Sequence, residues 1–370
     1  MTRGFRRRSP RKPVDVMYVA AGTTAGLRQA DVEMLGALRE HGLDVLTITP
    51  SFRTPRLISR YAQRSLLTID ALEAFALRRA AVDALRSHAP RAIIYSTSHA
   101  AMLAPRMSAR SRVGIRFDTP AQMSRSGAPY RVEYLLERRR FRQARVLMPW
   151  ALDLEPDTAR VLPPETPVIP IPIPIDLDGP PEGASRDPIV VFYGASPHKK
   201  GLDVAVRAWA RASTAGRRLV VTGIDRDRGL RYLNEHGIEE PTAVEWAGLL
   251  PPSLHRDLTR RAEVYLAASR YENYGIGPLE ALADGAALVT TPSPGPFAAL
   301  PIARELDPRL VAERDTPDAL AGALESAFAR EQGERVTYRG RARELLRVFS
   351  REETSRRLRQ EVLPLLLGQT

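Results

Sequence analysis

The chain has 370 residues, of which 44% are hydrophobic and 26% are charged, and its formal net charge is +12. This composition is that of a soluble globular protein and excludes a disordered chain, and the length suits two domains of ordinary size. The absence of cysteine excludes disulfides, cysteine nucleophiles and thiolate metal sites, and no apolar run approaches the length that spans a bilayer.

Predicted strands and helices alternate along the first half, which favours a parallel α/β architecture. A basic, disordered tail is expected over residues 1–12, and residues 13–172 are expected to form the first domain. Apolar runs predict strands at residues 14–20, 43–49, 91–96, 113–117, 145–150 and 167–171. Helical spacing predicts helices near residues 27–41, 68–88, 99–110 and 130–144. The proline-dense segment at residues 163–188 is the expected crossing between domains.

The second half restarts the same alternation, and a second domain is expected over residues 173–345. Residues 189–193 form a continuous apolar run, which is typical of a strand that helices cover on both sides. A helix is predicted at residues 201–213, and further strands at residues 218–222, 243–246, 263–267 and 287–291.

The most informative segment joins the predicted strand at residues 263–267 to a helix that Pro278 is expected to open. Glu272 and Glu280 bracket this turn with seven residues between them, so both carboxylates are expected in one crevice at the strand's carboxyl end. The N–H groups of Gly275–Gly277 have no helical partners and sit at the positive end of the helix dipole. The turn is a candidate site for a nucleotide diphosphate sugar; the alternative is a capped helix without a ligand.

The pattern over residues 269–285 is a Ser-x-x-Glu, a glycine, a second Glu followed by Ala, and a later Gly. It resembles the E-x7-E segment of family 4 (group 1) glycosyltransferases. The resemblance implies the GT-B fold: two α/β, Rossmann-like, doubly wound parallel-sheet domains that face one another across a cleft. It further implies that a C-terminal helix over residues 346–370 returns to the first domain. The first domain would then bind the acceptor and the second the donor.

The same resemblance implies roles for single residues. Glu272 would lie by the transferred sugar, Glu280 would bind the ribose, and the residues Gly275, Ile276 and Gly277 would bind the diphosphate. The backbone around Leu249, after a hydrophobic-x-Gly segment, would hold the base. Reaction with retention of the anomeric configuration, with no metal ion and no cofactor besides the nucleotide-sugar co-substrate, is implied as well.

Lys200 precedes Gly201 where the first strand of the second domain leads into its helix. A cation there would neutralise the departing nucleoside diphosphate. The family pattern is Gly-Arg, a spacer and Lys-Gly, and Lys200 matches its lysine, but Ala195 stands at the arginine position. Either Lys199, His198 or a distant arginine takes over that role, or donor binding is weaker or altered.

Three residues are candidates at strand ends of the first domain. Gly22 follows the first strand and would let backbone approach the donor or acceptor, although an ordinary turn explains it equally well. His99 lies two residues beyond the family's His-x-His position and would contact the donor sugar; the alternative is a histidine at a helix start. Asp118 is a candidate for orienting the acceptor, or else the cap of a turn before Pro120.

The expected function is transfer of a hexose-type sugar from a nucleotide-diphosphate sugar to a glycan, lipid or small-molecule acceptor. The alternatives are a nucleotide-sugar epimerase or phosphorylase on the same fold, or a catalytically reduced relative that binds sugars or membranes. The arginine cluster at residues 138–145 indicates either contact with an anionic membrane or a solvated face. No aromatic-interleaved basic strand supports nucleic-acid binding. We expect a cytoplasmic protein, with the inner face of the membrane as a further location.

Overall fold

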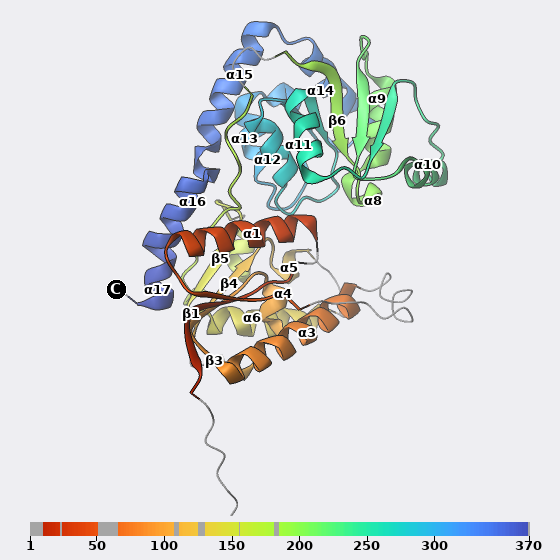
Figure 1. Cartoon of the computed structure of the whole chain (residues 1–370). Helices are drawn as coiled ribbons and strands as arrows, with labels where there is room; N and C mark the ends of the chain where they lie inside the picture. The colour runs from red at the N-terminus through yellow and green to blue at the C-terminus, as the bar shows by residue number, and fades with distance from the viewer. Residues whose placement is uncertain are drawn as a thin grey trace, which may run out of the picture. The chain divides into compact units, whose positions relative to one another are not determined.

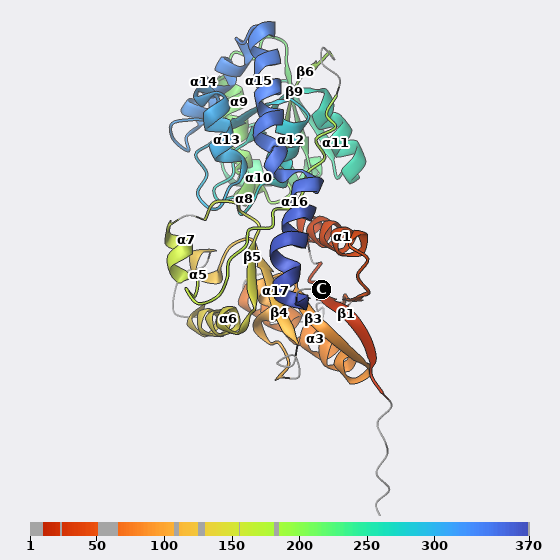
Figure 2. The ribbon, with the colours of Figure 1, turned by 90° about the vertical axis from the view of Figure 1, so that its left-hand side faces the viewer.

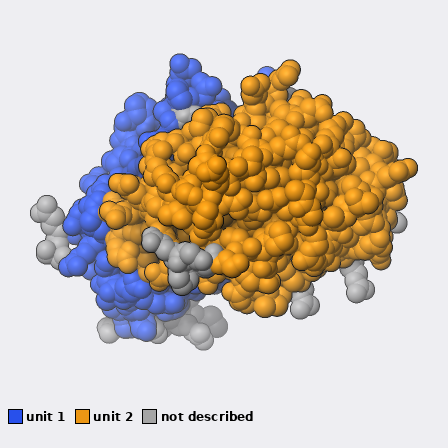
Figure 3. All heavy atoms as spheres, turned by 90° about the horizontal axis from the view of Figure 1, so that it is seen from above, with its two compact units in different colours: residues 1–173, 354–370 blue, residues 174–353 orange. Residues whose placement is uncertain are grey.

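The structure is a computed structural model that describes residues 10–22, 24–50, 66–106, 111–124, 130–154, 156–180 and 185–368. The chain divides into two compact units (Figure 3). Unit 1 comprises Met1–Ile173 and Thr354–Thr370, and unit 2 comprises Pro174–Glu353. Most of the expected basic tail lies outside the described residues, and the first strand already begins at Lys12.

Unit 1 is built on one parallel sheet of five strands in the order β2-β1-β3-β4-β5. The strands are β1 (Lys12–Val19), β2 (Val45–Ile48), β3 (His88–Tyr95), β4 (Arg112–Phe117) and β5 (Val146–Pro149). The helices from the first part of the chain are α1 (Ala25–Glu40), α3 (Leu66–Ser87), α4 (Ser98–Met102), α5 (Ala121–Ser124), α6 (Arg131–Gln143) and α7 (Pro156–Val161).

The two faces of this sheet are covered by different parts of the chain. Helices α3, α4 and α6 cover one face, where Leu77, Leu85 and Phe141 join a buried apolar cluster. Helix α1 covers the other face together with residues 358–367, which follow helix α16 (Arg351–Arg357) and include helix α17 (Leu363–Leu367) (Figure 2). A π-helical turn, Leu358–Val362, joins these last two helices. The C-terminal segment is thus part of the core of unit 1.

The prediction of a strand at residues 167–171 is wrong. This segment follows β5 through backbone bonds such as Ile169 N to Leu147 O at 2.9 Å, but it forms only an isolated bridge. Pro167, Pro170 and Pro172 lack N–H groups, so the segment cannot donate a regular ladder of hydrogen bonds.

Unit 2 has a second parallel sheet of five strands in the order β10-β9-β6-β7-β8. The strands are β6 (Asp187–Tyr193), β7 (Arg218–Thr222), β8 (Val244–Gly248), β9 (Ala262–Ala267) and β10 (Ala287–Thr290). The helices are α8 (Pro197–Lys200), α9 (Leu202–Arg211), α10 (Arg226–Glu235), α11 (Pro252–Arg261), α12 (Ile276–Ala283), α13 (Ala299–Leu306), α14 (Pro317–Phe328) and α15 (Gln332–Leu345) (Figure 1). The predicted class of two doubly wound parallel α/β sheets is confirmed.

Each sheet has one point at which the strand order reverses direction, and ligands of open α/β sheets bind at such points. In unit 1 this point lies between β1 and β3, and in unit 2 it lies between β6 and β9. The loops that follow these four strands are therefore where a binding site is expected. Among the described residues, no helix has the length and apolarity to span a bilayer.

Candidate active site

A lysine and a glutamate meet where the strand order of unit 2 reverses. Lys200 ends α8, after β6, and Glu272 lies in the loop after β9. Lys200 Nζ donates a hydrogen bond to Glu272 Oε2 at 2.5 Å, and Ser269 Oγ donates to the same oxygen at 2.9 Å. The Glu272 side chain is 8% exposed and that of Lys200 is 23% exposed. The structure thus brings together two of the predicted site residues.

The backbone fixes the distance between these two loops. Gly201 has φ +69°, and a Cβ there would lie 2.0 Å from the carbonyl oxygen of Ala268. Arg270 N donates to Lys199 O at 2.9 Å, which adds a second backbone link between the loops. The close approach that only glycine permits therefore places Lys200 beside Glu272.

Helix α12 begins at Ile276, so Pro278 is its third residue and not its first as predicted. Proline is tolerated here because N–H groups of the first turn have no acceptor within the helix. Gly275 is the N-cap with φ +82°, and a Cβ there would lie 2.7 Å from the Phe297 ring. The N–H groups of Ile276 and Gly277 in the first turn thus lie at the positive end of α12, four and five residues beyond Glu272.

A loop after β10 holds the Glu272 loop in place, and the sequence did not reveal this contact. Glu272 N donates to Pro294 O at 3.0 Å, and Ala298 N donates to Tyr274 O at 3.1 Å. Gly295 has φ +101°, and a Cβ there would lie 2.5 Å from Glu272 O. The run of Pro and Gly at residues 292–296, directly after a strand, is the signal that could have indicated it.

Glu280 lies on α12 in an ion-pair network with helix α11. Its Oε1 is 3.0 Å from Arg256 Nη1, and the Glu280 side chain is 20% exposed. Arg256 Nη2 also donates to Oδ1 of the fully buried Asp284 at 2.9 Å. Burial alone would lower the pKa of Arg256, but the hydrogen bond and negative charge of Asp284 outweigh burial and raise it. Neither Arg256 nor Asp284 was predicted as a partner.

The carboxyl ends of β6 and β7 lie beside a partly buried histidine that the sequence did not indicate. His255 Nδ1 is 3.2 Å from Thr222 Oγ1, and its ring centroid is 5.5 Å from that of Tyr193. Burial, followed by the charge of Arg256, lowers the pKa of His255. Leu249, predicted near the base, is 76% exposed and directly follows Gly248, whose φ is +70°.

The three candidates of unit 1 each have a local partner at the carboxyl ends of adjacent strands. The carbonyl of Gly22, which has φ +58°, accepts a bond from Arg28 Nη1 at 3.2 Å. His99 Nε2 is 3.0 Å from Oε1 of the buried Glu133. Asp118 Oδ1 accepts a bond from Thr119 N at 2.7 Å.

Below the Gly22 loop, unit 1 buries a charged network that sequence reasoning missed. Tyr18 donates to Asp31 Oδ1 at 2.7 Å, and Arg116 Nη1 donates to the Tyr18 hydroxyl at 3.0 Å. Arg116 is 1% exposed and Asp31 is 6% exposed. Burial raises the pKa of Asp31, while the hydrogen bond from Tyr18 and the charge of Arg116 act in the opposite direction. Ser96 Oγ, after β3, accepts a bond from Ala21 N at 2.9 Å and closes the gap between the strands.

Comparison with known proteins assigns the architecture. The chain is similar to sucrose-phosphate synthase from Thermosynechococcus elongatus, with a TM-score of 0.73, 14% identity, and 97% of this chain and 100% of that chain covered. It is also similar to Anabaena HepE in complex with UDP and glucose, with a TM-score of 0.65, 14% identity, and coverage of 94% and 98%. The fold is GT-B.

The chain is also similar in structure to S. aureus TarM, with a TM-score of 0.59, 13% identity, and coverage of 80% of this chain and 58% of that chain. Residues 187–330 match the family model of group 1 glycosyl transferases. Lys200, Glu272 and Glu280 lie within this range, whereas the candidates of unit 1 lie outside it. A search of curated proteins found no match.

Proposed function

We propose that this protein transfers a hexose-type sugar from a nucleotide-diphosphate sugar to an acceptor, with retention and without a metal ion. The observation that carries the proposal is the contact between Lys200 and Glu272 at the reversal point of the unit 2 sheet, beside the first turn of α12. The match to group 1 glycosyl transferases over residues 187–330 and the UDP-sugar complexes of HepE support it.

Different residues would bind different parts of the donor. The diphosphate would accept hydrogen bonds from the N–H groups of the first turn of α12, where the helix dipole favours an anion. Lys200 would neutralise the charge that builds up on the leaving diphosphate, which is the term with the largest effect on such a reaction. Glu272 would then accept hydrogen bonds from hydroxyl groups of the sugar, and Glu280 from the ribose.

Arg270 does not replace the arginine that is missing at position 195. Arg270 leaves the same loop as Glu272, but both of its terminal nitrogens donate to Asp203, at 3.0 and 2.6 Å. Asp203 therefore holds this guanidinium in a bidentate pair. We assign the charge compensation at the diphosphate to Lys200 and the amides of α12.

Helix α6 supports contact of unit 1 with an anionic membrane. Val132 and Leu135 on this helix are 66% and 68% exposed, and Arg131, Arg138 and Arg139 are exposed beside them. Such a mixture of apolar and basic side chains suits the surface of a bilayer with anionic lipids. Sedimentation with vesicles that contain phosphatidylglycerol tests this contact; binding that survives Leu135→Glu would contradict it.

The experiment that tests the function is incubation of the purified chain with a panel of nucleotide sugars, with and without acceptor extracts. Release of a nucleoside diphosphate that requires an acceptor and disappears in Lys200→Ala and Glu280→Ala supports a transferase. A changed sugar without any acceptor supports an epimerase or phosphorylase instead. No release with any donor supports a binding protein. Nuclear magnetic resonance of the product reports retention, and activity that persists in a chelator reports metal independence.

A further inference from the structure

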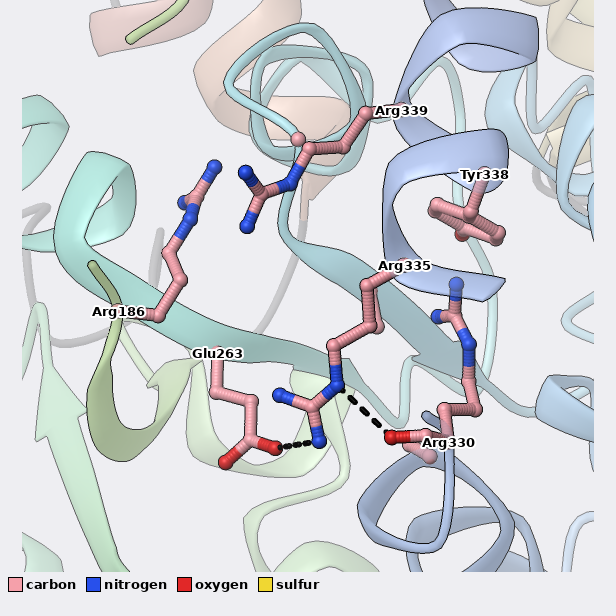
Figure 4. Close-up of a pocket in the computed structure, with 9 residues that line it drawn as sticks. Arg186, Glu263, Arg330, Arg335, Tyr338 and Arg339 are labelled. Carbon is pink, nitrogen blue, oxygen red and sulfur yellow. Dashed lines mark hydrogen bonds and ion pairs between the residues drawn. The ribbon is translucent and has the colours of Figure 1, made fainter. Parts of the chain in front are cut away.

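A pocket lined by arginines lies at the edge of the unit 2 sheet opposite the candidate active site (Figure 4). It is formed around the amino ends of three strands: Arg186 precedes β6, Glu263 is the second residue of β9, and Ala287 begins β10. Strand β9 has six residues and so spans roughly 20 Å between this edge and the Glu272 loop. The pocket is therefore separate from the donor site.

The pocket holds more positive than negative charge. Four arginines line it, Arg186, Arg330, Arg335 and Arg339, and Glu263 is the one acidic residue in its lining. Glu263 is already shared: Arg335 Nη2 is 2.6 Å from its Oε1, and Arg217 Nε is 2.6 Å from its Oε2. The carboxylate of Glu263 is thus already paired with Arg335, which lines the pocket, and with Arg217, which does not.

Arg186 and Arg339 point their guanidinium groups toward one another (Figure 4). Among the residues that the structure describes, no carboxylate forms an ion pair with either group, and the Nε atoms of both are buried without a hydrogen-bond partner. Arg186 is held in this orientation because its Nη1 donates to Arg260 O at 2.7 Å and its Nη2 donates to Asp284 O. Burial, followed by the charge of Arg339, lowers the pKa of Arg186 to about 10.

Gly285 and Arg330 complete the shape of the pocket. Gly285 has φ +78°, and a Cβ there would lie 2.9 Å from Arg186 Nη2 and 2.9 Å from Arg339 Cγ, so glycine keeps the space between the two arginines open. Arg330 is 6% exposed, its guanidinium lies over the Tyr338 ring at 4.2 Å, and its Nε has no hydrogen-bond partner in the described structure. The volume is about 20 Å³, more than the roughly 10–15 Å³ that one water requires.

We propose that this pocket binds a compact tetrahedral oxyanion of the phosphate class between Arg186 and Arg339. The guanidinium of Arg339 donates to such an ion as a fork. Arg186 donates from the opposite side through its Nε, which has no partner among the described residues, and the second hydrogen of Nη2, because its Nη1 already donates to the carbonyls of Arg260 and Ala262. The ion removes the repulsion between like charges and supplies acceptors to buried N–H groups. The enclosed volume holds little more than one water, so it excludes a whole nucleotide, and the ion enters with only part of its tetrahedron, as a free ion or as the terminal group of a phosphate monoester.

The test is calorimetric titration of the full chain with inorganic phosphate, at an ionic strength held constant with sodium chloride. Arg339→Gln is the informative variant, because Arg339 is half-buried and its loss removes one fork without emptying the core. Arg341→Gln is the matched control: it removes the same charge from the same helix, but Arg341 is 50% exposed and does not line the pocket. Lys200→Ala reports binding at the donor site.

We expect saturable phosphate binding by the unmodified chain and by Arg341→Gln and Lys200→Ala, and affinity at least about tenfold weaker in Arg339→Gln. Sulfate should compete with phosphate because it has the same shape. Tighter binding of glycerol 3-phosphate than of phosphate assigns the site to a monoester, and weaker binding assigns it to the free ion. The proposal is overturned if phosphate does not saturate, if Arg339→Gln binds it equally well, or if Lys200→Ala abolishes binding.

Discussion

The reversal points of the two sheets are used in opposite ways. Between β6 and β9, unit 2 holds Lys200 against Glu272 at the loop ends, with the Lys200 side chain partly exposed. Between β1 and β3, unit 1 closes the corresponding position with the bond from Ala21 N to Ser96 Oγ and buries Arg116 beneath it. One unit thus leaves a charged side chain partly exposed at this point, and the other uses its charges within its own core.

The strand orders differ as well. Unit 2 has the order of the dinucleotide-binding Rossmann fold, whereas the described strands of unit 1 follow the flavodoxin-like order. Both orders create a single reversal point. The topology therefore determines where a site can form, and the residues in the loops determine whether one does.

The largest effect is expected from breaking the core network of unit 1 with Arg116→Ala. This change leaves the Tyr18 hydroxyl without its donor and the buried Asp31 without the nearby positive charge, and removing one member of a buried charged network costs about 3–5 kcal/mol of stability. Urea unfolding followed by circular dichroism measures it. Unchanged stability would show that unit 1 does not depend on these charges.

Lys200→Ala tests whether the charge of Lys200 in unit 2 contributes to activity and not to stability. We expect kcat/KM for donor-dependent transfer to fall by about 100- to 1000-fold, because the leaving diphosphate loses its cation, while stability changes little. Release of nucleoside diphosphate measures the rate. Arg218→Ala is the control, because Arg218 is a 56% exposed arginine at the start of β7, paired with Glu245. A large loss of stability in Lys200→Ala would show that the charges of unit 2, like those of unit 1, stabilise the fold.

Glu280→Gln tests which part of the donor Glu280 binds in unit 2. The amide has no negative charge and replaces one acceptor oxygen by an NH2 donor, so we expect KM for the donor to rise by about tenfold with a smaller change in kcat. A drop in kcat with KM unchanged would instead give Glu280 a role at the reacting sugar. Initial-rate kinetics over a range of donor concentrations separates these results.

The smallest effect concerns pH. Burial lowers the pKa of His255 below its ordinary value of 6.5, so the unfolded state binds more protons between the folded pKa and about pH 6.5. The stability that this group contributes is present above about pH 6.5 and is lost as the pH falls through the folded pKa. The slope is at most about 1.4 kcal/mol per pH unit. His255→Asn should flatten the pH dependence of urea unfolding between about pH 7.5 and 5.5; an equal slope would contradict this assignment.

What the sequence could predict was decided by local signals. The strands around Glu272 and the turn at Gly275 were found because an apolar run, a glycine and a proline follow one another within a short segment. The strand at residues 167–171 was predicted wrongly because its apolar residues were weighted above the prolines between them. The predicted helix at 99–110 is only five residues long as α4, which ends before Pro105.

The partners of the site residues could not be predicted in the same way. Arg256 is 24 positions from Glu280, and Arg116 is 98 positions from Tyr18. A charged residue in a strand or helix reads as exposed, and its burial depends on which strands become neighbours. The roles of Gly22, His99 and Asp118 stay predictions, since each of them also has an ordinary local function.

The placement of Leu358, Val362 and Leu366 in the apolar core of unit 1 has a consequence for synthesis on the ribosome. The amino-terminal sheet emerges first, yet one of its faces has only helix α1 as cover until all of unit 2 has been translated. Apolar surface of unit 1 therefore stays exposed on the nascent chain while unit 2 is translated, and we expect chaperones to bind it. Supplying the residues after 350 as a separate peptide should let the isolated first half complete its core.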